Sequence, residues 1–566
     1  MNPASNGTPP CLLPVTSWTH LLPQADTAPV APLVLPMDAP PSGEDGLASA
    51  ASRAETAFTA GDLDGAGRIL DDLLACDDAP DVLRGADIAA AVWSQRGMLA
   101  RGAEVYRWLG PERAKASAPL AVVAMVGTGD RQGAETMAAA EGCGGSPTQL
   151  AVAVRLMGQG VLDSIGTTPV LALPALIRAS DMMTASGTAA PLPELPGALA
   201  ALAALHNGEP EVAGSVLAAA LAGGQGGPAG RRHLLLLQAW TRMLQDHPEA
   251  AHSALAEAAA IDHPVLPRDE MLLLALDVGL ARRTDDIPAL VRAWQRARTG
   301  LLHVAIDLFS LLPLGELMVA AARLRESARL EPHLAEAWSL LERLGDPPLW
   351  AVPLHWQAVQ AAILAERPAD LAPHAAALVR ASEKHHLAAV LAAAGRTWIQ
   401  VLAGHVEVPA VETAARGLAG VGLTWDGSRL AGHAAGRAEE RRDTARLLAC
   451  ARDLHPGSSG PPAPGHKGSL LIQPHSPGQP ARAHGAGALP QPGDRTVSLL
   501  SDREREVARH VLAGRTYREI GAAMFISPRT AEHHIARIRR RLGAASRSEL
   551  LDQLRLALGD GHTGPP

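Results

Sequence analysis

A long succession of short helices is the feature that most limits what this chain can fold into. From Leu47 to about Leu454, Ala- and Leu-rich stretches of about 12 to 18 residues alternate with short Gly, Pro or Asp breaks. The aromatic content of 3% is lower than strands favour. Because 566 residues also exceed what one hydrophobic core organises, the sequence predicts an all-α protein of several domains.

The breaks between these helices recur at a regular interval. Successive turn centres are separated by about 34 to 42 residues, or by about twice that distance, which is typical of a repeated helical hairpin. In such an α-solenoid each hairpin buries its apolar face only against its neighbours. The units resemble degenerate tetratricopeptide repeats. The expected turn centres are Gly61, Gly129, Gly208, His247, Thr284, Arg367, Gly404 and Ala438, and the tryptophans expected to fill the spaces between helices are Trp93, Trp240, Trp294, Trp338, Trp356 and Trp398.

The helical region lies between segments that lack any helical period. Residues 1–45 are dense in Pro with Ser, Thr and Gly, a composition that buries too little apolar surface to offset the entropy of ordering. Residues 456–494 have the same character, and as a flexible coil they would span roughly 35 Å. The predicted organisation is a disordered tail at 1–45, a repeat region at 46–455, a flexible linker at 456–494, a C-terminal domain at 495–560 and a tail at 561–566.

Charge is distributed unevenly along the chain. The net charge is −8, yet residues 495–558 contain 13 Arg and 7 acidic residues, so this segment carries +6 and the remainder −14. A small basic module attached to a large acidic body is the balance expected when only the C-terminal part contacts a polyanion.

The basic module contains signals for four short helices. Ser501, Thr516 and Ser546 each precede a Glu by three residues, which is the capping-box pattern, and Ser527 precedes a Pro at the first helical position. Helices are therefore expected to begin near 502, 517, 528 and 547. The three-residue turn between the second and third helices predicts a helix-turn-helix, whose later helix lies in the major groove of DNA.

The third of these helices has two chemically distinct faces. A helical period places Ala531, Ile535, Ile538 and Leu542 in one apolar stripe. The opposite side can donate hydrogen bonds to guanine edges or phosphates, and Glu532 at its edge can accept one from cytosine N4. The start of the second helix can hold a phosphate. The predicted DNA contacts are Thr516, Tyr517, Arg518, Arg529, Thr530, Glu532, His533, Arg537 and Arg540.

The runs 500–507, 514–520 and 526–534, followed by Arg541-Leu542-Gly543, resemble the LuxR/NarL-type DNA-binding domain. The resemblance implies that the third helix reads the major groove of a promoter and that the fourth mediates dimerisation. It implies a dimer face at Leu550, Leu551, Leu554 and Leu558. The chain departs from the family at Glu532 and Ala536, where many members carry Lys, so the operator sequence cannot be carried over from the family.

The repeat region resembles, in architecture alone, the helical-repeat sensor of large MalT-type regulators, which also carry an N-terminal ATPase. No G-x-x-x-x-G-K-[ST] motif occurs in this sequence, and the run 465–469 lies in the predicted linker without the strand and helix that shape a phosphate cradle. The four cysteines are far apart, which indicates neither a disulfide framework nor a zinc site. We therefore expect no catalytic residues, no metal and no cofactor, and no enzymatic activity.

The sequence contains no targeting or membrane signal. No Lys or Arg precedes Arg53, so the positive region of a secretory signal is missing, and the longest apolar run, 301–314, is interrupted by Asp307 and Pro313. These features predict a cytoplasmic protein that does not contact the membrane.

Two hypotheses follow for the function. In the first, the chain is a transcription regulator that binds double-stranded promoter DNA as a homodimer, while its repeats sense a protein or small-molecule effector; RNA polymerase is a further candidate partner. In the alternative, the chain is a tetratricopeptide-like scaffold whose basic C-terminal module binds an acidic protein. A sigma-like subunit is disfavoured because no second basic, aromatic-rich segment lies upstream.

Overall fold

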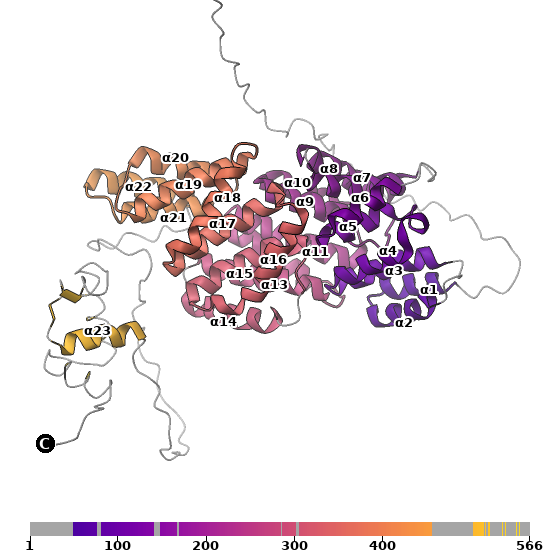
Figure 1. Ribbon diagram of the computed structural model, residues 1–566, viewed down its shortest axis with the longest axis horizontal. Coiled ribbons are helices and arrows are strands. Elements are labelled where there is room, and N and C mark those ends of the chain that lie inside the picture. The colour runs from indigo at the N-terminus through magenta and orange to yellow at the C-terminus, as the bar shows by residue number, and fades with distance from the viewer. Residues whose placement is uncertain are drawn as a thin grey trace, which may run out of the picture. The chain divides into compact units, whose positions relative to one another are not determined.

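The computed structural model describes residues 49–75, 81–140, 148–166, 169–284, 286–301 and 305–455, together with 502–513 and the positions 515, 516, 519, 520, 532, 535, 538, 551 and 554. The chain divides into two units, residues 1–474 and 475–566. Every regular element in these described parts is helical (Figure 1). The all-α fold expected from the sequence is confirmed, whereas the predicted tails and linker lie outside the described residues.

The first unit consists of twenty-two α-helices in its described part, and most of them pack against the next helix along the chain. The first eleven are α1 (Ala50–Thr59), α2 (Leu63–Leu74), α3 (Val82–Gln95), α4 (Leu99–Arg113), α5 (Ala118–Gly127), α6 (Arg131–Ala140), α7 (Gln149–Ser164), α8 (Ala172–Ser186), α9 (Pro196–Asn207), α10 (Pro210–Ala222) and α11 (Gly227–Leu244). The others are α12 (Pro248–Ala259), α13 (Pro267–Arg283), α14 (Ile287–Gly300), α15 (Leu311–Leu324), α16 (Glu331–Leu344), α17 (Pro348–Ala365), α18 (Pro368–Ala381), α19 (His386–Leu402), α20 (Val408–Gly420), α21 (Thr424–Ala435) and α22 (Arg441–Leu454).

The turns between these helices fall where the sequence predicts them. Each of the eight expected turn centres lies between two consecutive helices, from Gly61 between α1 and α2 to Ala438 between α21 and α22. Gly208 ends α9 with a φ of 79°, a left-handed conformation that glycine adopts without steric cost. All eight expected turns are thus present, whereas the tetratricopeptide-like repeat stays a prediction.

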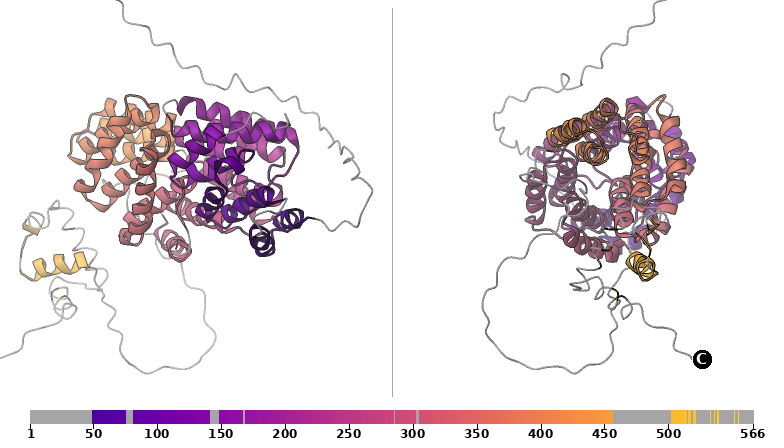
Figure 2. Two further views of the ribbon diagram at one scale, coloured as in Figure 1. Left: turned by 45° about the vertical axis from the view of Figure 1, so that its right-hand side comes forward. Right: turned by 90° about the vertical axis from the view of Figure 1, so that its left-hand side faces the viewer.

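The expectation that each hairpin contacts only its neighbours is wrong. Helix α9 packs against α17, and α3 packs against α13, although many helices separate the members of each pair. Trp350 on α17 donates a hydrogen bond from its indole nitrogen to the Ser164 hydroxyl on α7 at 2.9 Å. Arg131 on α6 donates to the backbone oxygen of Leu344 on α16 at 3.0 Å. Figure 2 shows the violet helices of the first half against the salmon helices of the second.

The cause is the apolar character of particular helices on every side. All residues of α5 are buried, as are residues 196–206 of α9. A helix that is apolar all round must lie inside the protein, with other helices on both sides of it. Helices adjacent in the chain cover only part of the surface of such a helix. Helices that come later in the chain therefore pack against the remaining surface.

The repeat region contains more than one hydrophobic core. A large first core extends from Val82 to Ala361, and a second core extends from Val352 to Cys450, so α17 contributes to both. A smaller cluster occupies α1 to α3. Trp240, Trp294, Trp356 and Trp398 are each at most 2% exposed, which confirms their packing role, whereas Trp93 and Trp338 are half-buried.

We expect Trp350→Ala to lower the free energy of unfolding by about 3–5 kcal/mol, because it removes a fully buried indole and its hydrogen bond to α7. Trp108→Ala is the matched control, since Trp108 is 46% exposed and the Arg113 guanidinium lies 5.2 Å from the centre of its ring. Trp108→Ala should lower the free energy of unfolding by about 1 kcal/mol or less. Thermal unfolding followed by circular dichroism measures both, and equal losses in the two variants would contradict the account.

Candidate DNA interface

The described part of the second unit begins with a helix at the position that the sequence predicts. Helix α23 (Asp502–Leu512) starts at the expected residue and buries Val507 and Ala508 completely. The predicted cap at Ser501 and the predicted stop at Gly514 lie outside the described residues.

The capping box predicted at Thr516 is present, with reciprocal hydrogen bonds between Thr516 and Glu519. The Thr516 amide donates to a Glu519 carboxylate oxygen at 2.7 Å, and the Glu519 amide donates to the Thr516 hydroxyl oxygen at 3.4 Å. The Thr516 hydroxyl also donates to the same carboxylate oxygen at 2.8 Å. These hydrogen bonds from the backbone and the hydroxyl of Thr516 lower the pKa of Glu519 from its usual value.

The cap restricts what Thr516 can do at a DNA backbone. Both of its donors, the amide and the hydroxyl, are directed at the Glu519 carboxylate. A phosphate contact from Thr516 therefore requires one of these donors to leave Glu519, and the carboxylate itself repels a phosphate. Sequence reasoning identified the capping box but did not connect it with the phosphate contact, although the Thr-x-x-Glu pattern was the available signal.

Three described positions lie on the expected third helix and fix its buried side. Glu532, Ile535 and Ile538 are all helical. Ile535 is 9% exposed and Ile538 is 1% exposed, whereas Glu532 is exposed. The apolar stripe is confirmed at these two isoleucines, and its other predicted members, Ala531 and Leu542, lie outside the described residues.

Most of the predicted contact residues lie outside the described residues. Thr516 and Glu532 are both exposed, as a DNA contact requires. Among the predicted dimer residues, Leu554 is fully buried within the single chain and Leu551 is half-buried. Leu554 therefore supports the packing of one copy, and the expected dimer face stays a prediction. The predicted residues outside the described part are Tyr517, Arg518, Arg529, Thr530, His533, Arg537, Arg540, Leu550 and Leu558.

The described residues contain no cluster of three or more His, Cys, Asp or Glu side chains arranged to hold a metal ion. None of the described helices combines the length and the apolar character needed to cross a membrane.

Comparison with known proteins points to the same C-terminal segment. The family described as bacterial regulatory proteins, luxR family, matches residues 498–554. The spore germination protein GerE of Bacillus subtilis (strain 168) is 37% identical over 62 residues, which cover 11% of this chain and 82% of that protein. The matched segment includes both the capping box at Thr516 and the helix with buried Ile535 and Ile538.

The cap generates a prediction about the Thr516 amide. Glu519→Ala removes the carboxylate that accepts from this amide, so its protection from hydrogen exchange is expected to fall, whereas Glu519→Gln keeps an acceptor oxygen and is the matched control. Exchange mass spectrometry over a peptide containing residues 515–520 measures the protection factor. Equal protection in Glu519→Ala and in the unchanged chain would contradict the account.

The same cap predicts a pH dependence of defined sign. Because folding lowers the pKa of Glu519, its contribution to stability is fully present above the ordinary pKa of 4.5. The contribution is lost as the pH falls through the lower, folded value. In the unchanged chain the protection factor of the Thr516 amide should therefore fall below about pH 4.5, and in Glu519→Gln this decrease should be absent.

Proposed function

Through residues 498–554 the chain belongs to the luxR family of bacterial regulatory proteins, and from this premise we propose that it regulates transcription by binding promoter DNA sequence-specifically as a homodimer. The helix that contains Ile535 and Ile538 is the one that enters the major groove. The proposal includes no enzymatic activity and no cofactor.

The observation that carries this proposal is the burial of Ile535 and Ile538 next to the exposed Glu532. These three positions fix the rotational phase of the helix, because its buried side is now known. A period of 3.6 residues then predicts that four of the basic side chains between 529 and 540 lie on the side opposite the two isoleucines. The residues expected there are Arg529, His533, Arg537 and Arg540.

The charge distribution supports the same assignment. The segment 495–558 carries +6, so phosphate contacts and counterion release favour its association with duplex DNA. The remainder of the chain carries −14 and is repelled by the same polyanion. DNA binding is therefore assigned to the C-terminal unit alone.

The proposed contacts divide into two kinds. Arg537 and Arg540 donate to guanine edges or phosphates, and Glu532 accepts from a cytosine amino group. Tyr517 and Arg518 hold the DNA backbone, with Thr516 contributing when it is released by Glu519. Glu532 and Ala536 stand where many family members carry Lys, so the preferred DNA sequence should differ from theirs.

We propose that the repeat region is the sensor and that its ligand is a protein or a small molecule. RNA polymerase is a further proposed partner at the promoter. The scaffold alternative assigns the basic module to an acidic protein instead, and the experiment below separates the two functions because it uses DNA alone.

The experiment selects duplexes from a randomised DNA pool with the full chain and then titrates the enriched sequence. Arg537→Ala and Arg540→Ala are each expected to weaken binding by about 1–3 kcal/mol where a base contact is lost. Where a phosphate contact is lost, the slope of log affinity against log salt should fall by about 1. Arg441→Ala is the matched control, because Arg441 is exposed on α22 in the other unit.

Binding that both C-terminal substitutions leave unchanged would contradict the proposed DNA face. Failure to enrich any sequence over the starting pool would contradict sequence-specific binding and would favour the scaffold alternative.

A further inference from the structure

We propose that helix α18 is an acid-sensitive switch: two neutral histidines hold it against α16 and α17, and protonation of both histidines releases it. The histidines are His355 on α17 and His374 on α18, and their rings pack against the Trp338 indole on α16. The inference goes beyond the proposed function and does not depend on DNA binding.

The rings of His355, His374 and Trp338 lie against one another where the three helices meet. The Nδ1 atoms of the two histidines are 3.0 Å apart, which is a hydrogen-bond distance. The Trp338 ring stacks on both, with its centre 4.8 Å from that of His355 and 5.1 Å from that of His374. A neutral imidazole carries one N–H group, so at this contact one ring donates from Nδ1 and the other accepts. The contact therefore requires at least one neutral ring.

Protonation of both rings removes this hydrogen bond. Each imidazolium carries a hydrogen on Nδ1, so the two N–H groups point at each other and no acceptor remains between them. The two positive charges also repel, most strongly where burial excludes water. A cation–π attraction to Trp338 stabilises one imidazolium but does not relieve the repulsion between two. Separation of α18 from α17 relieves both costs.

The surroundings keep the two rings neutral at neutral pH. Burial, His374 and Arg380 lower the pKa of His355 to about 4. Burial also lowers the pKa of His374, and Asp370 opposes that shift. Asp370, His374 and Arg380 are the titratable residues of α18, and His355 is the titratable residue of α17.

The titratable residues on the other helices around the pair face the solvent or other partners. The exposed ones are Glu331, Glu336, Glu342 and Arg343 on α16 and His386 and Arg396 on α19. The others are His333 on α16, which contacts the Leu301 backbone oxygen, Glu316 and Arg323 on α15, which contact Arg282, and His206 on α9, which lies against Trp350. The pKa of each ring in the pair is therefore set by burial and by charges on α17 and α18.

Helix α18 is held less firmly than α17. Among the described side chains of α18 only Leu378 is buried, whereas α17 buries eleven residues. Pro373 also removes a backbone hydrogen-bond donor from the interior of α18. A helix with few buried contacts opens locally at a smaller cost in free energy than the core does. Loss of the histidine contact can therefore release α18 without unfolding its neighbours.

The pH dependence of this release has a defined sign. Once α18 is released, water reaches both rings and their pKa returns toward the ordinary value of 6.5. Below pH 6.5 the released state therefore binds more protons than the attached state. The attachment of α18 is strongest above pH 6.5 and weakens as the pH falls toward about 4. The shift in the pKa of His355 alone makes release about tenfold more favourable at pH 5.5 than at pH 7.5.

Release of α18 changes the surface of the second core. Leu378 belongs to this core, and Ile363 of α17 and Leu371 of α18 pack against it. Acid therefore uncovers apolar side chains on the core that ends at α22, the last helix before the predicted linker at 456–494.

Hydrogen-exchange mass spectrometry on the full chain without DNA tests the switch. Protection factors, which correct for the intrinsic effect of pH on exchange, are compared at about pH 7.5 and about pH 5.5 for peptides from α18 and from α20. Helix α20 is the internal reference, because it belongs to the same core and contains no histidine. We expect the protection of α18 to fall about tenfold or more at the lower pH, and that of α20 to fall about twofold or less.

The double variant His355→Gln and His374→Gln keeps two polar side chains that cannot take up a proton. Its α18 protection should change by about twofold or less between the two pH values. If this variant has already lost α18 protection at the higher pH, His374→Gln alone is measured. Its loss of protection on acidification should be about half or less of that in the unchanged chain.

His433→Gln is the matched control. Burial, Arg437 and Arg429 also hold the pKa of His433 at about 4, and its ring centre lies 5.2 Å from that of Trp398, but His433 is on α21. This variant should retain the full loss of α18 protection on acidification.

The proposal is overturned if α18 keeps its protection at the lower pH, if α18 and α20 lose protection equally, or if the double variant retains the full loss. Because no DNA is present, these outcomes do not depend on whether the chain regulates transcription. Conversely, loss of DNA binding in Arg537→Ala leaves the exchange result unaffected.

Discussion

The burial of helices that are apolar on every side is the constraint on which the repeat region depends. Helices α5 and α9 have no polar face to present to water, so they must be covered by helices from distant parts of the chain. The hydrogen bond from Trp350 to Ser164 and the packing of α9 on α17 are consequences of that requirement. The result is a set of repeats that return on themselves and enclose two cores, with a pocket where the cores meet.

Local chemistry was predictable from the sequence, whereas contacts between distant segments were not. The turn at Gly208 and the cap at Thr516 were identified correctly, because glycine conformation and capping depend on residues within one helical turn. The nearest-neighbour arrangement of the hairpins was wrong. A helical period identifies an apolar face but not the helix that covers it, so the partner of Arg131, more than 200 residues away in sequence, had no local signal.

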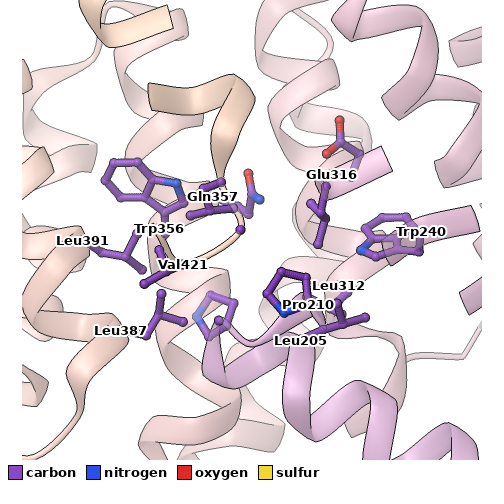
Figure 3. A pocket seen from close by; sticks show the side chains of 15 residues that line it. Leu205, Pro210, Trp240, Leu312, Glu316, Trp356, Gln357, Leu387, Leu391 and Val421 are labelled. Carbon is purple, nitrogen blue, oxygen red and sulfur yellow. The ribbon is translucent and has the colours of Figure 1, made fainter. Parts of the chain in front are cut away.

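The same contrast between local features and long-range contacts applies to the candidate sites. For the DNA face, the period of the third helix indicated its buried side in advance, and burial of Ile535 and Ile538 confirms it. The small cavity beside Trp240 and Trp356 (Figure 3) had no sequence signature, because its walls come from residues between 205 and 423 and only folding brings them together. Two carboxylates bear on the proposed DNA face: Glu519 engages both donors of Thr516, and Glu532 stands where the family resemblance implies a lysine.

The central claim is that a basic helix near the C-terminus reads promoter DNA. Crosslinking the full chain to DNA in living cells and sequencing the recovered fragments tests this most directly. The account predicts discrete sites upstream of genes that share a two-fold symmetric sequence, as a homodimer requires. Recovery of DNA in proportion to its abundance, with no enriched sites and no shared sequence, would contradict it.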